Sequence, residues 1–227
     1  MREQIIQILR DEAKWAGPFI MLPQPEVTPA LSGPRPESTV DDELDLLRAM
    51  ISSCTSCPLW QTRKNIVPGE GKTNAQVMFI GEAPGAVEDE TGRPFVGPAG
   101  KLLTDIIEKG MGLKREDVFI ANILKCRPPS NRDPEDYEVE ACIGFLHEQI
   151  KAVNPKVIVA LGRIASHKLL EDNTPISKLR GEFRNYRGIL TMPTYHPSYL
   201  LQNPSKKREV WEDIKKVMEV LGISILK

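Results

Sequence analysis

Four cysteines are the residues of this chain best suited to holding a metal. Cys54 and Cys57 form a CxxC pair, and Cys126 and Cys142 complete the set. Two thiolates spaced in this way can bind one metal centre, and two further thiolates close its coordination shell. Both a zinc ion and a [4Fe–4S] cluster accept four cysteines, so the spacing leaves both open. A further interpretation is that the cysteines are buried as small apolar side chains.

Four other side chains are candidates for chemistry on a flat, polar ring. Glu88 can orient a water molecule, and Phe95 offers a flat surface for stacking. Asn122 carries both a donor and an acceptor, and His196 can donate a hydrogen bond to developing charge. The alternative interpretation is structural: a solvated acidic run, a core phenylalanine and an asparagine that ends a strand.

Asn122 and His196 lie where strands are expected to end, whereas Glu88 and Phe95 lie one loop after the end of the first strand. Four short apolar, β-rich runs precede them, at 76–80, 118–123, 157–161 and 189–194. The segments at their ends are GEAPG, Asn122 with KCRPP, LGR and YHPSYLLQNP. Ligands of open α/β sheets bind beyond the carboxyl ends of the strands. We therefore expect these segments to meet at one site.

Helical stretches separate the four apolar runs. They are expected at about 99–110, 134–152 and 163–171, with a last helix at 205–221. Nearly continuous apolar strands between helices are typical of a parallel sheet that is covered on both faces. The pattern predicts an α/β fold, a three-layer α/β/α domain with a central, mainly parallel four-stranded sheet.

The chain is predicted to have two parts. Residues 1–37 are expected to form an N-terminal helix and a proline-rich linker, since the proline density of the linker excludes regular helix and sheet. Ser38 or Thr39 can cap the next helix, because Asp41 and Asp42 follow three positions later. We therefore expect the globular domain to span residues 38–227.

Composition is that of an ordinary globular protein. The 227 residues are 41% hydrophobic and 27% charged, which argues against a disordered or fibrous chain. No apolar run is long enough to span a membrane, and the first residues mix charges into their apolar positions, unlike a secretory signal. We expect a cytoplasmic protein, in which disulfides are disfavoured. The net charge of −1 neither supports nor excludes a nucleic-acid partner.

Together these motifs resemble the family-four uracil-DNA glycosylases, the iron–sulfur members of the uracil-DNA glycosylase superfamily. The resemblance runs from about Cys54 to the C-terminus and rests on GEAPG, TGRPFVGPAG, NILKCRPPSNRDP, VIVALGR and HPSYLLQNP in this order. It implies hydrolysis of the N-glycosidic bond of deoxyuridine in DNA, which releases uracil and leaves an abasic site. It also implies that the cysteines hold a structural [4Fe–4S] cluster, with Cys54, Cys57, Cys126 and Cys142 as ligands.

The resemblance also implies roles for the residues of the pocket. Phe95 would stack on the extruded uracil, Asn122 would hold its O4/N3 edge, and His196 would stabilise the uracil anion. The GEAPG turn, with Gly81, Ala83 and Gly85, would line the pocket. Family-one enzymes have an aspartate in place of Ala83 and a tyrosine in place of Gly85. We expect Glu88 to compensate by orienting water or walling the pocket, with Glu82 as the second candidate.

Contacts to DNA are expected from the segment after His196. Ser198, Tyr199 and Leu200 resemble the family's minor-groove wedge, with Leu200 as the inserted side chain, and Lys206 and Arg208 are placed to meet phosphates. The expected partner is uracil-containing DNA, double- or single-stranded, bound by a monomer. The N-terminal segment is a candidate for recruiting a repair or replication partner.

Two other functions are compatible with the residues. One is an iron–sulfur or zinc module that binds nucleic acid without catalysis, for which Ala83 leaves room. The other is the covalently trapping branch of the same superfamily. It is disfavoured because KCRPPSNRDP lacks that branch's basic, histidine-containing insertion.

Overall fold

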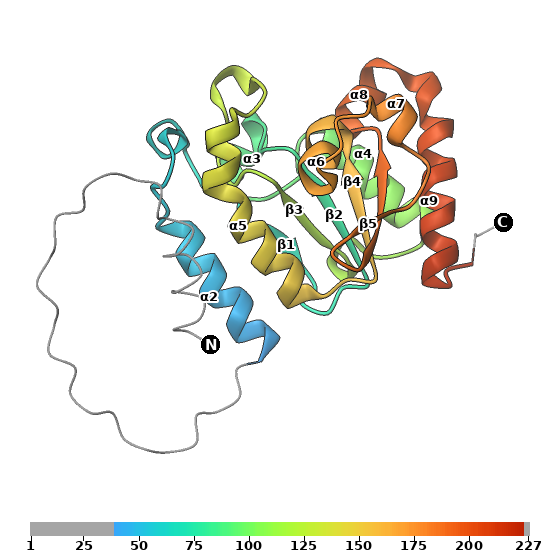
Figure 1. Cartoon of the computed structure of the whole chain (residues 1–227), viewed down its shortest axis with the longest axis horizontal. Helices are drawn as coiled ribbons and strands as arrows, with labels where there is room; N and C mark the ends of the chain where they lie inside the picture. Colours follow the sequence, from blue (N-terminus) through green and yellow to red (C-terminus); the bar gives the residue numbers. More distant parts are fainter. Residues whose placement is uncertain (1–38, 225–227) are drawn as a thin grey trace, which may run out of the picture. The chain divides into compact units, whose positions relative to one another are not determined.

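The computed structural model describes residues 39–224 of the chain. The predicted N-terminal helix and proline-rich linker therefore lie outside the described residues. The described part is a mixed α/β fold built around one sheet (Figure 1).

The sheet has six strands rather than the predicted four. In chain order they are β1 (Glu70–Gly71), β2 (Val77–Gly81), β3 (Phe119–Asn122), β4 (Val157–Leu161), β5 (Arg184–Tyr186) and β6 (Ile189–Thr194), and the spatial order is β1-β3-β2-β4-β6-β5. The four inner strands are parallel and correspond to the four apolar runs. The two edge strands are antiparallel. They are two and three residues long and mostly polar or glycine, so they carry no run of apolar residues to reveal them.

Eight α-helices lie within the described residues. They are α2 (Val40–Ser52), α3 (Ala86–Thr91), α4 (Pro98–Asp105), α5 (Asp136–Val153), α6 (Gly162–Leu170), α7 (Ile176–Leu179), α8 (Pro197–Gln202) and α9 (Lys207–Leu221). A π-helical turn, Ile106–Gly110, extends α4, and short 3-10 turns occur in several loops. None of the helices between residues 39 and 224 has the length and apolar content that crossing a membrane requires.

Helices pack on both faces of the sheet, because successive side chains along each strand point to opposite faces. In β2, Met78 and Ile80 face the core shared with α2, α5 and α6, whereas Val77 and Phe79 face the core shared with α4 and α9. Figure 1 shows α2 and α5 on one side of the strands and α9 on the other.

The strand order creates a crevice at one end of the sheet. The chain runs from β2 to its neighbour β3 and then crosses to β4 on the opposite side of β2. At such a switch the connecting segments diverge, and ligands bind at the carboxyl ends of the strands. The predicted motifs all follow these strand ends.

Helix α2 begins at the predicted cap and leads into the CxxC pair. The hydroxyl of Thr39 accepts a hydrogen bond from the backbone N–H of Asp42, and the Asp42 carboxylate accepts one from the backbone N–H of Thr39. This capping box confirms Thr39, rather than Ser38, as the cap of this helix.

A buried carboxylate joins α9 to the rest of the domain. Asp213 is 1% exposed and accepts hydrogen bonds from Thr194 Oγ1 at 2.5 Å and from Arg180 Nε at 3.0 Å. Burial raises the pKa of Asp213, while the hydrogen bonds from Thr194 and Arg180 oppose this rise. Removing the carboxylate would leave the buried hydroxyl without this acceptor and would leave the Arg180 guanidinium with Glu209 alone of its two acidic partners among the described residues.

We expect Asp213→Ala to lower the free energy of unfolding by about 3–5 kcal/mol, the usual effect of breaking a buried ion pair. Glu212→Ala is the matched control on the same helix, because Glu212 is exposed and its ion pair is with the neighbouring surface residue Lys215. The control should change stability by less than about 0.5 kcal/mol. Urea unfolding curves measure both variants, and equal stability losses would contradict this role for Asp213.

Candidate active site

A cavity of about 310 Å³ lies beyond the carboxyl ends of the inner strands, and we call it the strand-end cavity. Its walls come from the segments after β2, β3, β4 and β6, as the sequence predicted. Its lining residues are Glu82, Ala83, Pro84, Gly85, Glu88, Phe95, Ala99, Asn122, Pro128, Asn131, Arg132, Gly162, Arg163, His196 and Ser198.

Phe95, Asn122 and His196 meet at this cavity although they are far apart in the sequence. The rings of Phe95 and His196 lie 5.6 Å apart, centroid to centroid, with their planes tilted by 36°. Gly81, at the end of β2, lies against two of the three groups. A Cβ atom there would come within 2.5 Å of both the Asn122 Oδ1 atom and the Phe95 ring, so only glycine allows this approach.

The amide of Asn122 is buried at the end of β3 with an unused acceptor. The residue is 2% exposed, and its Oδ1 atom has no hydrogen-bond partner among residues 39–224. A buried acceptor without a donor is costly, and in native proteins such an atom calls for an explanation. Because Asn122 lines the cavity, a ligand that brings a donor would satisfy it.

His196 is held in one tautomer by the residues that follow it. Its Nδ1 atom accepts a hydrogen bond from the backbone N–H of Ser198 at 3.1 Å, and the Ser198 hydroxyl lies 2.7 Å away. The neutral ring therefore carries its proton on Nε2. Burial lowers the pKa of His196 to about 4, although the Glu88 carboxylate opposes the shift. The imidazole is thus neutral at pH 7.

Gly162 makes room for His196 from the end of β4. It has φ +87°, and a Cβ atom there would lie 2.8 Å from the Cβ of His196. The glycine of the LGR motif therefore has a steric purpose that the sequence alone did not assign. The neighbouring Arg163 lines the mouth of the cavity and pairs with Asp133 at 2.5 Å, and it too was not among the predicted site residues.

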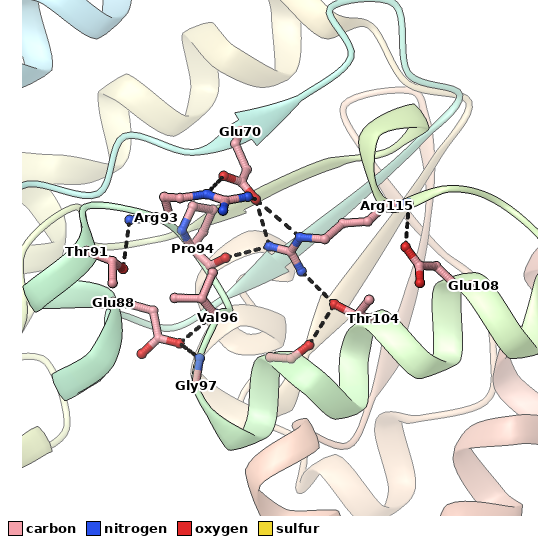
Figure 2. Close-up of polar contacts among 11 residues, drawn as sticks. Glu70, Glu88, Thr91, Arg93, Pro94, Val96, Gly97, Thr104, Glu108 and Arg115 are labelled. Atoms are coloured by element: carbon pink, nitrogen blue, oxygen red, sulfur yellow. Dashed lines mark hydrogen bonds and ion pairs between the residues drawn. The ribbon is translucent and has the colours of Figure 1, made fainter.

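The two predicted carboxylates line the cavity in different environments. Glu88 Oε1 accepts the backbone N–H groups of Val96 and Gly97 at 2.9 and 2.8 Å, so this carboxylate holds the loop that carries Phe95 (Figure 2). Burial raises the pKa of Glu82 to about 7, the charge of Asp133 adds to the rise, and Arg163 opposes it. Glu82 therefore exchanges its proton near neutral pH.

The predicted wedge is corrected by the burial of its central residue. Leu200 is 1% exposed and belongs to the core shared with α4 and α9, so it is not available for insertion into DNA. Tyr199 and Leu201 are exposed instead, at 39% and 46%. One face of α8 packs on the core, and the sequence alone did not show whether Leu200 or Leu201 would lie on that face.

The predicted phosphate contacts lie outside the cavity lining. Lys206 pairs with Glu209 at 2.6 Å, and Arg208 is exposed on the first turn of α9. Arg132 lines the cavity but is bound by both oxygens of the fully buried Glu138. That pairing fixes Arg132 in place.

All four cysteines are free thiols and line a second, small cavity, the cysteine cavity. Arg63 Nη1 lies 3.0 Å from the Sγ atom of Cys126, and the backbone N–H of Lys125 donates to the Sγ atom of Cys142 at 3.3 Å. Burial raises the pKa of Cys142 to about 12, despite the nearby Lys125. Within residues 39–224, no three His, Cys, Asp or Glu side chains are arranged to hold a single metal ion.

Lys125 joins the cysteine cavity to the strand-end cavity. Its ammonium group is completely buried and donates to the carbonyl of Asn122 at 2.9 Å and to Gln149 Oε1 at 2.6 Å. Gln149 in turn donates to the carbonyl of Pro68 at 2.7 Å. The residue next to Cys126 therefore fixes the backbone of Asn122.

Sequence comparison shows which known proteins this chain is similar to. Residues 68–215 match the family described as the uracil DNA glycosylase superfamily. A type-4 uracil-DNA glycosylase of Saccharolobus solfataricus is 48% identical over 80% of this chain and 88% of its own length. One of Thermotoga maritima is 46% identical over 78% and 94%. A type-5 uracil-DNA glycosylase of Pyrobaculum aerophilum is 34% identical over 65% and 72%. With its fold, its strand-end cavity and these relatives, the chain belongs to the uracil DNA glycosylase superfamily.

Proposed function

We propose that this chain is a uracil-DNA glycosylase that hydrolyses the N-glycosidic bond of deoxyuridine in DNA, releasing uracil and leaving an abasic site. It is a hydrolase of base excision repair. The observation that carries the proposal is the convergence of Phe95, Asn122 and His196 on one cavity in which a buried amide oxygen lacks a donor. The three relatives described above are all named as glycosylases, which disfavours a binding module without catalysis.

Asn122 gives the cavity its preference for uracil. Its unpartnered Oδ1 atom accepts the N3–H of uracil, and its Nδ2 donates to O4. Cytosine presents an acceptor at N3 and a donor at C4, so both hydrogen bonds would be reversed. A site whose buried polar groups lose their partners rejects the wrong ligand strongly.

Phe95 and His196 act on the extruded ring and on its leaving bond. Phe95 stacks on the face of the uracil, which must leave the base stack to reach the cavity. His196, neutral at pH 7, donates its Nε2 proton in a hydrogen bond to the uracil as negative charge develops. The neutral imidazole can stabilise this charge through the hydrogen bond alone, without first taking up a second proton.

A carboxylate positions the attacking water, and two candidates remain. Glu88 is the first, since its Oε1 is occupied by backbone amides and its Oε2 remains for water, close to Gly85. Glu82 is the second. In either case an ionised Glu82 stabilises the positive charge that develops on the deoxyribose as the bond breaks, because the transition state resembles an oxocarbenium ion.

Contacts to the DNA strand come from the exposed side chains around the cavity. Tyr199 and Leu201 flank the buried Leu200 and are available to fill the gap left by the extruded base. Ser198 and Arg163 line the mouth, and Arg208 and Lys206 extend the polar surface beyond it. We propose that the protein acts on this DNA as a monomer.

The four cysteines suit a [4Fe–4S] cluster better than one zinc ion. A zinc ion needs its four ligands around one point, whereas each thiolate of a cluster binds a different iron. The resemblance to the family-four enzymes favours the cluster, and all four thiols line one small cavity. Cys54, Cys57, Cys126 and Cys142 would hold it, and hydrogen bonds from Arg63 and from the Lys125 backbone would stabilise the thiolates. The cluster would supply a structural tie and no redox step.

His196→Ala and Asn122→Ala should each lower kcat on deoxyuridine oligonucleotides by about 10²–10³-fold, the usual cost of a lost donor to transition-state charge or of a lost substrate contact. His167→Ala is the matched control, because His167 hydrogen-bonds the carbonyl of Thr174 and lies outside the cavity lining. Strand scission at the abasic site after alkali treatment measures the rate. Wild-type rates in both site variants, with unchanged thermal stability, would refute the proposed site.

The rate should rise about tenfold between pH 6 and pH 8, since a carboxyl group with a pKa near 7 changes from mostly protonated to mostly ionised over that interval. The rate rises with pH because the pKa of Glu82 is raised to about 7. Below pH 7 the Glu82 carboxyl group is mostly neutral, and above pH 7 its negative charge stabilises the sugar cation. His196 contributes no step there, because it is neutral above about pH 4. Single-turnover rates at constant ionic strength measure the profile. Glu82→Gln should be slower and lack the step; a step that persists in this variant excludes Glu82 as its source.

Cys126→Ser should lose the visible colour and most of the soluble yield together, because a missing ligand opens the cluster and exposes apolar surface. The unmutated protein should be brown and contain about four iron atoms and as many sulfides per chain. Thr55→Ala, inside the CxxC loop but not a ligand, is the control and should keep both. A colourless protein with one zinc ion would overturn the cluster, and unchanged colour in Cys126→Ser would exclude that ligand.

A further inference from the structure

The backbone of Phe95 adopts a conformation that its side chain disfavours. Its φ is +49°, in the left-handed region that residues other than glycine seldom adopt. Such a conformation persists only where the surroundings enforce it. The groups that hold Phe95 over Gly81 lie on both sides of its loop.

Two contacts hold the loop from the side of the strand-end cavity. Glu88 takes the backbone N–H groups of Val96 and Gly97, directly after Phe95. On α4, a Cβ atom at Gly100 would lie 1.9 Å from the carbonyl carbon of Phe95, so the helix packs directly against this backbone. These contacts fix Phe95 and the residues after it, but they do not hold the residue before it, Pro94.

Arg115 holds the other side of the loop from outside the cavity. Its Nη2 donates to the carbonyl of Pro94 at 2.6 Å, and its Nη1 donates to Thr104 Oγ1 at 3.0 Å. The Thr104 hydroxyl donates in turn to the carbonyl of Gly100 at 3.0 Å. Figure 2 shows the guanidinium between the Pro94 carbonyl, the side chain of Thr104 and that of Glu70.

Glu70 on the edge strand β1 fixes the orientation of this guanidinium. It accepts from Arg115 Nη2 at 2.8 Å and from Nε at 3.2 Å, while Arg93 binds the same carboxylate at 2.8 and 3.1 Å. The two arginines differ in burial: the side chain of Arg115 is 16% exposed and that of Arg93 is 62% exposed. Only Arg115 is bonded to the carbonyl before Phe95.

We propose that Arg115 is a positioning residue for the stacking surface, acting through the Pro94 carbonyl to hold Phe95 against the uracil. The inference rests on the proposed function, in which Phe95 stacks on the base. A guanidinium fits this place because its planar fork serves three acceptors at once: the Pro94 carbonyl, Glu70 and Thr104. A lysine has one nitrogen and cannot hold all three in this geometry.

The test compares Arg115→Met with Arg93→Met on a single-stranded oligonucleotide that contains one deoxyuridine. Arg115→Met should lower kcat/KM by about tenfold and weaken inhibition by free uracil by a similar factor, since a misplaced contact loses positioning energy. Arg93→Met, which removes an exposed partner of the same Glu70 but leaves the bond to the Pro94 carbonyl in place, should stay within about twofold. Arg115→Lys should recover little of the loss. Equal losses at Arg93 and Arg115, or full recovery by lysine, would overturn the proposal.

A double-mutant cycle separates positioning from general stability. If Arg115 acts through Phe95, Arg115→Met should cost less than about twofold in a Phe95→Ala background, because the group it positions is gone. The same tenfold loss in both backgrounds would overturn the proposal. If Arg115→Met does not fold, Thr104→Val replaces it in the cycle, since it removes one acceptor of the guanidinium and keeps the volume.

The outcomes also distinguish this inference from the function on which it rests. A wild-type protein that leaves deoxyuridine intact would refute the glycosylase itself. A Phe95→Ala variant as active as the wild type would refute stacking and the role of Arg115 together. A severe loss in Phe95→Ala with additive effects of Arg115→Met would refute only the positioning role.

Discussion

The unpartnered Oδ1 atom of Asn122 is the constraint around which the strand-end cavity is built. It is buried at the end of β3, and it can approach the Phe95 ring only because Gly81 has no side chain. An acceptor kept out of water without a donor is unfavourable in the free protein and is satisfied when a ligand brings an N–H group. In the proposed function, the same atom links the free energy of binding to the choice of base.

The groups around Asn122 are each fixed from outside the cavity. His196 is oriented by Ser198 and approached closely by Gly162, and Phe95 is held between Glu88 and Arg115. Lys125 bonds the Asn122 carbonyl and continues directly into Cys126. Rigid placement of this kind favours catalysis, because the groups need not reorganise as charge develops. The chain thus connects Cys126 directly to the residue that fixes the Asn122 backbone.

Much of this fold follows from local sequence patterns, and the parts that do not follow depend on contacts between distant segments. The inner strands were predictable because they are short apolar runs followed by polar or glycine-rich segments. The edge strands β1 and β5 are too short and polar to carry such a signal. Asn122 and His196 were predictable as strand-end residues, Phe95 as an aromatic residue one loop after the first inner strand, and all three from the family resemblance. The burial of Leu200 rather than Leu201, the strained φ of Phe95 and the bond from Arg115 to Pro94 were not, because each is decided by tertiary packing.

The most direct test of the role of Asn122 is excision of 3-methyldeoxyuridine compared with deoxyuridine in the same single-stranded oligonucleotide. Methylation replaces the N3–H donor and leaves the C1′–N1 bond and the O2 and O4 atoms in place. We expect kcat/KM to fall on the order of 10⁴-fold, because the buried acceptor then faces a methyl group instead of a donor. Equal rates on the two bases would show that Oδ1 of Asn122 does not bind the N3 edge of the base.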